Sequence, residues 1–252
     1  MFLQFNPKNS FWPVLLSIMM FYCFLSFINF MILKNFFNLC TSIISLMLII
    51  FMWFKNLTTE SILLGGMNLF MQMNLKTGMI FFIISEIMFF FCFFWSYFHF
   101  MFLYSPEFGN CWPPVNINSL NYLSVPLLNT MLLLSSGLSI TLSHTLLMMN
   151  NKNFKVYLLL TIMLGLIFMS FQFFEYYILE FNWSMSSYSS IFFMGTGFHG
   201  FHVTLGSIML LIIYILQNKM NLLSSSYEMV AWYWHFVDMI WIILFTEFYW
   251  WV

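Results

Sequence analysis

The sequence predicts an all-α membrane protein with seven transmembrane helices, arranged as a two-helix hairpin and a five-helix bundle. Of its 252 residues, 62% are hydrophobic and only 6% are charged, whereas soluble domains carry about 25% charged residues. The apolar residues form continuous runs of about 20, the length at which a helix crosses a bilayer. Continuous runs without alternation exclude a membrane β-barrel, so helices are the remaining way to satisfy the backbone in lipid.

The individual helices follow from the apolar runs and the polar breaks between them. We expect spans near Trp12–Leu33, Phe36–Phe54, Met79–Leu103, Val125–Met149, Val156–Leu179, Ile191–Gln217 and Glu228–Trp251. The first two are joined by only a residue or two, which predicts a tight hairpin over residues 1–54. Residues 55–78 are expected to be an inner connector, and residues 79–252 the five-helix bundle. The proline-rich segment Tyr104–Ser124 is expected to lie outside the lipid.

The lysines predict the orientation of the chain. If successive connections alternate sides, six lysines fall on one side and Lys34 alone on the other; the six are Lys8, Lys55, Lys76, Lys152, Lys155 and Lys219. Positive residues concentrate on the inner side of membrane proteins. The N-terminus is therefore expected inside, with the C-terminus, Glu107 and Glu180 outside. The four cysteines are scattered, which predicts neither a disulfide framework nor a zinc site.

Span three carries the first polar group at membrane depth. Ser85, Cys92, Ser96 and His99 share one helical face. Glu86 lies beside this face, about two turns from the inner end of the span. An ionisable residue at this depth defaults to a functional hypothesis. Glu86 is either a proton-handling group or a neutral carboxyl bonded to a neighbouring helix.

Spans five, six and seven carry further polar candidates. Thr161, Gly165, Gln172 and Glu175 line up on span five; Gly195, His199, His202 and Gly206 on span six; and Glu228, Ala231, His235 and Asp238 on span seven. His199 and His202 favour interhelical hydrogen bonds over metal or haem ligation, because too few histidines accompany them. His235 and Asp238, three apart, are expected to pair on one helix. We interpret His99, Glu175, His199, His202, His235 and Asp238 as interhelical polar residues, with proton relay as the alternative.

No catalytic residues and no metal-ligand set are expected in this chain. The sequence lacks a nucleophile–base arrangement, a phosphate-binding glycine loop and a cysteine or histidine cluster. Three functions fit a helical bundle with buried polar seams. They are an accessory subunit of a larger complex, a stand-alone proton or ion transporter, and a membrane b-type cytochrome that uses His199 or His202.

Several long phrases resemble the mitochondrial cytochrome c oxidase subunit III family. They occur in order at Gly78–Glu86, Phe94–His99, Cys111–Pro114, Val125–Thr130, Thr196–Val203, Ala231–Asp238 and Tyr249–Trp251. The resemblance implies a non-catalytic core subunit of respiratory complex IV, which reduces O2 to water with electrons from cytochrome c and pumps protons. It further implies a hairpin splayed from the bundle and a place in the mitochondrial inner membrane, with the N-terminus on the matrix side and the C-terminus facing the intermembrane space.

The resemblance also implies partners and sites. No cofactor is expected in this chain; haem a and copper belong to partner subunits, and bound phospholipid is expected. Subunit I is the expected packing partner, together with other oxidase subunits and a respiratory supercomplex. The family's carboxyl-reactive glutamate maps onto Glu86, and its lipid-headgroup contacts onto Trp53, Lys55, Glu60 and Lys76. This chain has Lys55 and Thr59 where the family has arginines, and Met67 where it has histidine, so phosphate contacts are expected to differ.

Overall fold

The computed structural model describes residues 10–63, 69–103, 111–114, 117–118, 120–217 and 224–252. Lys8, Met67, Glu107 and Lys219, on which expectations were stated above, lie outside the described residues. The chain divides into two compact units, Met1–Asn74 and Leu75–Val252, each described by itself. The described residues form helices and no strand, which confirms the predicted fold class.

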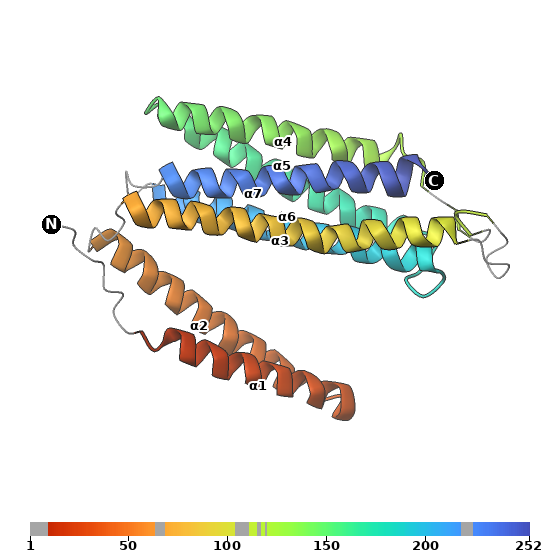
Figure 1. Cartoon of the computed structure of the whole chain (residues 1–252), viewed down its shortest axis with the longest axis horizontal. Helices are drawn as coiled ribbons and strands as arrows, with labels where there is room; N and C mark the ends of the chain where they lie inside the picture. Colours follow the sequence, from red (N-terminus) through yellow and green to blue (C-terminus); the bar gives the residue numbers. More distant parts are fainter. Residues whose placement is uncertain (1–9, 64–68, 104–110, 115–116, 119, 218–223) are drawn as a thin grey trace. The chain divides into compact units, whose positions relative to one another are not determined.

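Seven helices are long and apolar enough to cross a membrane in the described part of the chain. They are α1 (Trp12–Leu33), α2 (Phe36–Leu63), α3 (Leu69–Phe102), α4 (Val125–Met148), α5 (Phe154–Ile178), α6 (Ser187–Gln217) and α7 (Ser224–Phe245), which continues into the π-helical turn η2 (Thr246–Trp250) (Figure 1). Pro13 and Pro126 stand in the first turns of α1 and α4, where a missing N–H costs nothing.

Helices α2 and α3 are longer than the predicted spans. α2 continues past Phe54 to Leu63, and α3 already begins at Leu69, well before Met79. Most of the segment 55–78, expected as a connector, is therefore helical. The physical reason is that a helix satisfies its own backbone in water as well as in lipid, so polar residues do not end it.

The hairpin of α1 and α2 is held by small polar side chains. Ser26 and Ser42 are buried, whereas most apolar side chains of these two helices are exposed. Their hydroxyl oxygens lie 2.5 Å apart, and each serine also bonds a carbonyl of its own helix. Small residues let two helix backbones approach closely within a membrane, where burial of apolar surface supplies little drive for association.

The second unit places α4 beside α5 and α7, and α6 beside α5 and α7 (Figure 1). Its centre is Trp234 of α7, which is fully buried. The Trp234 indole donates to Ser136 Oγ of α4 at 2.9 Å. A Cβ added at Gly165 of α5 would lie 2.7 Å from the indole ring, and one added at Gly206 of α6 would lie 2.9 Å from it. Two glycines and a serine thus make the space that this large side chain fills.

The C-terminal end of α7 is tied to α3 and α6 by tyrosines. In the turn η2, Trp251 N–H donates to Thr246 C=O, the five-residue spacing of a π-helix. The Tyr97 hydroxyl of α3 donates to Glu247 C=O at 2.6 Å, and the Tyr188 hydroxyl of α6 donates to Phe248 C=O at 2.9 Å. Side chains of α3 and α6 therefore satisfy the carbonyls of Glu247 and Phe248, which accept no backbone hydrogen bond of an α-helix here.

Candidate functional site

Glu86 of α3 and His202 of α6 form a carboxyl–imidazole pair. The distance from Glu86 Oε2 to His202 Nε2 is 2.8 Å. The His202 side chain is 8% exposed and that of Glu86 23%. Residues 116 positions apart in the sequence are thus in direct contact, joining two helices that otherwise meet through aromatic side chains.

The second nitrogen of His202 determines what the pair can do. His202 Nδ1 lies 2.7 Å from Phe198 C=O of the preceding turn. A carbonyl oxygen only accepts hydrogen bonds, so Nδ1 carries a proton. One further proton must then lie between Nε2 and the carboxyl, because two lone pairs would otherwise face each other. Either the carboxyl donates to a neutral imidazole, or an imidazolium donates to a carboxylate. The arrangement is a holder for one shared proton.

The surroundings of the pair are aromatic. The His202 ring lies 5.1 Å from the Phe90 ring and 6.4 Å from the Tyr233 ring, measured between centroids. The Phe236 ring lies 6.5 Å away. An electrostatic hydrogen bond is stronger where the local dielectric is low, and aromatic side chains lower it around this pair.

Glu86 stands farther from the start of its helix than the sequence predicted. Glu86 stands at the middle of α3, and His202 at the middle of α6. The estimate of about two turns from the inner end assumed a helix starting at Met79, whereas α3 starts at Leu69. The matched positions in two long helices are the signal that could have predicted the contact. It was missed because the start of α3 was placed too late.

Glu175 and His199 also connect different helices. The Tyr249 hydroxyl of η2 donates to Glu175 Oε1 of α5, and both residues are buried. His199 Nε2 of α6 lies 3.3 Å from Val237 C=O of α7, and the His199 ring lies 5.0 Å from that of Trp241. These side chains lie at the contacts among α5, α6 and α7.

The proposed pairing of His235 with Asp238 is absent from the hydrogen bonds and ion pairs of the described residues. Both side chains lie beside Gly137 of α4 instead: a Cβ added at Gly137 would lie 2.7 Å from Asp238 Oδ2 and 3.8 Å from His235 Nδ1. The spacing of three residues allowed a pair on one helix. The glycine on the facing helix, which the spacing does not reveal, gives both side chains room toward α4.

The polar face predicted on α3 is not buried by the chain. Ser85, Cys92 and His99 are exposed, and the His99 ring lies 5.5 Å from that of its neighbour Phe100. The Ser85 hydroxyl donates to a carbonyl of its own helix, Phe82 C=O, at 2.6 Å. The structure therefore brings Glu86 to another helix, and leaves His99 at the surface of α3.

The lipid-headgroup candidates lie toward the ends of α2 and α3 that border residues 64–68. Trp53, Lys55 and Glu60 belong to α2, and Lys55 is exposed. Lys76 of α3 forms a salt bridge with Glu228 of α7. Among the described residues no group of three or more His, Cys, Asp and Glu side chains could hold a metal ion.

Comparison with known proteins gives one consistent result. The family model described as cytochrome c oxidase subunit III matches residues 6–252. A cytochrome c oxidase subunit 3 from Gazella leptoceros is 46% identical over 209 residues, which is 81% of this chain and 80% of the relative. The protein of the same name from Equus caballus is 44% identical over 217 residues, 84% of this chain and 83% of the relative.

Proposed function

The chain belongs to the cytochrome c oxidase subunit III family, and from this premise we propose that its Glu86–His202 pair holds a proton for the oxidase at mid-membrane depth. As a subunit of the mitochondrial oxidase, the chain has other oxidase subunits as partners. The observation that carries the proposal is the 2.8 Å contact between Glu86 Oε2 and His202 Nε2, with Nδ1 committed to Phe198 C=O.

The role is accessory to the catalytic chemistry. Haem a and copper are assigned to partner subunits because the family resemblance implies it; among the described residues no group of three or more His, Cys, Asp and Glu side chains could hold a metal ion. The chain packs on the catalytic subunit I, and the pair supports proton uptake and protects the enzyme during repeated turnover. A shared proton can be given up and regained without moving either helix, because Phe198 C=O holds the His202 ring in place.

We also propose a binding site for a phospholipid headgroup and an orientation of the chain in the membrane. Trp53, Lys55 and Glu60 on α2 suit a phospholipid headgroup at the matrix side, since a lysine ammonium offers a point charge to phosphate. Lys76 takes part less directly, because Glu228 already neutralises it. The lysine distribution puts the N-terminus in the matrix and the C-terminus in the intermembrane space. Membership of a respiratory supercomplex rests on the family alone.

The substitution Glu86→Gln tests the proposal, because it keeps the side-chain shape and removes the exchangeable proton. We expect normal assembly, judged by the haem spectrum of the purified oxidase. The number of turnovers before inactivation should fall about fivefold, the equivalent of about 1 kcal/mol, because the glutamine amide can still donate to His202 Nε2 but cannot release a proton. Proton uptake should slow with it.

Glu180→Gln is the matched control. Glu180 is an exposed carboxylate at the end of α5 that accepts a hydrogen bond from Asn118 at 2.8 Å. The Glu180→Gln variant should leave the number of turnovers before inactivation and the rate of proton uptake unchanged. If Glu86→Gln also leaves turnover, durability and proton uptake unchanged, Glu86 is only a structural contact in this protein.

A further inference from the structure

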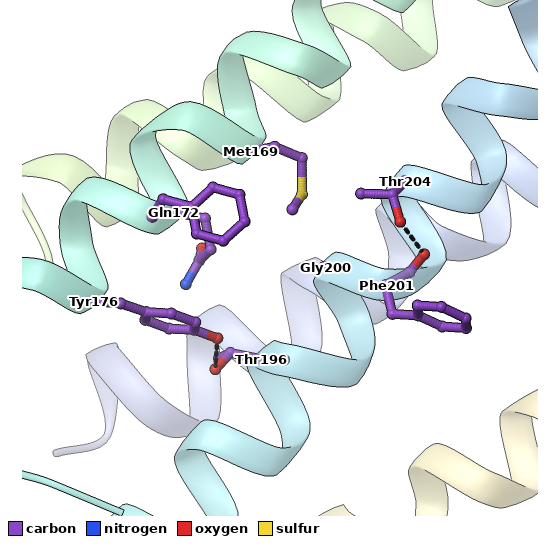
Figure 2. A pocket seen from close by; sticks show the side chains of 9 residues that line it. Met169, Gln172, Tyr176, Thr196, Gly200, Phe201 and Thr204 are labelled. Atoms are coloured by element: carbon purple, nitrogen blue, oxygen red, sulfur yellow. Dashed lines mark hydrogen bonds between the residues drawn. The ribbon is translucent and has the colours of Figure 1, made fainter. Parts of the chain in front are cut away.

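A cavity of about 260 Å³ lies between α5 and α6, and neither Glu86 nor His202 is among its lining residues. Figure 2 shows Met169, Gln172 and Tyr176 of α5 facing Thr196 and Gly200 of α6 across this space. Apolar groups form most of its wall. Phe173 and Phe201, which also line it, are 65% and 57% exposed, so the cavity is reached from the outside of the bundle.

Two glycines of α6 keep the cavity open. A Cβ added at Gly197 would have only the Tyr176 hydroxyl in reach, at 4.0 Å. A Cβ added at Gly200 would meet the flexible end of Met169, with Cε at 3.4 Å. A side chain at position 197 would therefore extend into the space without displacing the backbone.

The hydroxyl groups around the cavity already donate their protons to hydrogen bonds within the protein. Thr196 donates to Phe192 C=O at 2.6 Å, so the Tyr176 hydroxyl is the donor in its 2.6 Å contact with Thr196 Oγ1. Thr204 donates to Phe201 C=O at 2.7 Å. These groups retain acceptor capacity only, and none of them can donate to a ligand.

Gln172 is the polar group whose amide is buried beside the Tyr176 hydroxyl without a hydrogen bond of good geometry. It is 2% exposed, and neither Nε2 nor Oε1 has a partner of hydrogen-bond geometry among the described residues, although the amide adjoins the Tyr176 hydroxyl. Figure 2 shows its amide nitrogen directed away from α5, into the space beside Tyr176 and Thr196. Buried amides are almost always bonded, so this amide has capacity to bind a group that enters the cavity.

We propose that this cavity binds a neutral, hydroxyl-bearing lipid, whose hydroxyl donates to Gln172 Oε1 and accepts from Gln172 Nε2 while its apolar body lies along Gly197 and Gly200. A primary amide both donates and accepts, and a hydroxyl matches both functions. An ester carbonyl would leave Oε1 unpaired. No charged side chain lines the cavity, which disfavours an anionic phosphate at this position.

Photolabelling of the assembled oxidase tests the proposal. The oxidase would be reconstituted in nanodiscs with a diazirine analogue of hexadecanol, and labelled peptides would be identified by mass spectrometry. Matched probes are a diazirine hexadecane without the hydroxyl, and a phosphatidylcholine with the diazirine in one acyl chain. We expect the alcohol to label the peptides that contain Gln172 and Gly197, about fivefold or more above the hydrocarbon, because one hydrogen bond corresponds to roughly that factor.

Two variants locate the site. Gln172→Met keeps the length of an unbranched side chain and removes the amide, so alcohol labelling should fall to the level of the hydrocarbon probe. Gly197→Leu fills the cavity and should abolish labelling by all three probes. Gly78→Leu is the control, since a Cβ at Gly78 has no described atom within 4 Å; labelling should persist.

Three results would overturn the proposal. Equal labelling by alcohol and hydrocarbon, or unchanged labelling in Gln172→Met, would show a cavity without hydroxyl recognition. Labelling by the phosphatidylcholine probe alone would identify a phospholipid acyl chain as the occupant. No labelling in the unmodified oxidase would show that the cavity is closed, for example by a partner helix. Glu86→Gln should not affect labelling, which separates this site from the proton-holding pair.

Discussion

Trp234 fills the space in which α4, α5 and α6 come together, and its environment leaves no room for an added methyl group. The nearest approach is at Gly165, where a Cβ would lie 2.7 Å from Cη2 of the indole. Membrane interiors give helices little hydrophobic drive to associate, so packing of this kind holds the bundle. A glycine here is needed for space and not for backbone conformation.

Gly165→Ala should therefore destabilise the protein. Because the indole is held by Ser136 and cannot move freely, overpacking should cost about 1–3 kcal/mol. The measurement is the thermal denaturation midpoint of the assembled oxidase, which should fall. Gly78→Ala, where a Cβ meets no described neighbour, should leave it nearly unchanged. If the Gly165 variant is as stable as the Gly78 variant, Trp234 is not the packing centre.

The sequence predicted which polar residues lie in the apolar helices better than it predicted which residues they contact. The sequence singled out Glu86, His202, His235 and Asp238 as polar groups in apolar helices, and all four lie in helices as expected. It did not predict that Glu86 meets His202, since this depends on the relative height of α3 and α6. It also paired His235 with Asp238. The spacing of three residues shows that both lie on one face of the same helix, but it does not show which residues of the neighbouring helix they meet.

At the scale of helices, the α1–α2 hairpin shows how little is needed to join two spans. Among the described side chains of this hairpin, Ser26 and Ser42 are the buried ones, and their hydroxyls touch. Most apolar side chains of the two helices are exposed. The ends of the helices were harder to predict than their existence, because hydropathy marks where lipid ends while α2 and α3 continue beyond that point.

Ser42→Leu should loosen this hairpin. A leucine cannot fit where two serine hydroxyls lie 2.5 Å apart, so the helices must separate. Hydrogen–deuterium exchange of the oxidase in nanodiscs should show faster exchange in both α1 and α2. Ser42→Ala should produce a much smaller change, since it removes one hydrogen bond and keeps the close approach. Equal exchange in the leucine variant and the unmodified protein would contradict this account of the hairpin.

For the whole molecule, the odd number of spans and the lysine distribution make one joint prediction. If all seven helices of sufficient length cross the membrane, the two ends of the chain lie on opposite sides. In mitochondria stripped of their outer membrane, a C-terminal tag should be open to added protease and an N-terminal tag protected. Inside-out inner-membrane vesicles should show the reverse. Tags that respond alike would mean that one helix does not cross.

The positions of the buried polar side chains favour a subunit of a complex over a transporter that works alone. Its buried polar side chains lie mostly at helix contacts: Glu175 bonds Tyr249, and Tyr227 bonds Ser143. The Glu86–His202 pair differs because the geometry requires a proton between two titratable groups. Because the chain belongs to a family of oxidase subunits, we propose that this proton serves the oxidase.

The most direct measurement is a double-mutant cycle on this pair. Glu86→Gln, His202→Gln and the double variant would be compared in the assembled oxidase by the number of turnovers before inactivation. If one proton is held jointly, each single variant loses the whole effect, about fivefold, and the double variant loses no more. Losses that multiply in the double variant would show two independent residues, and would contradict a shared proton.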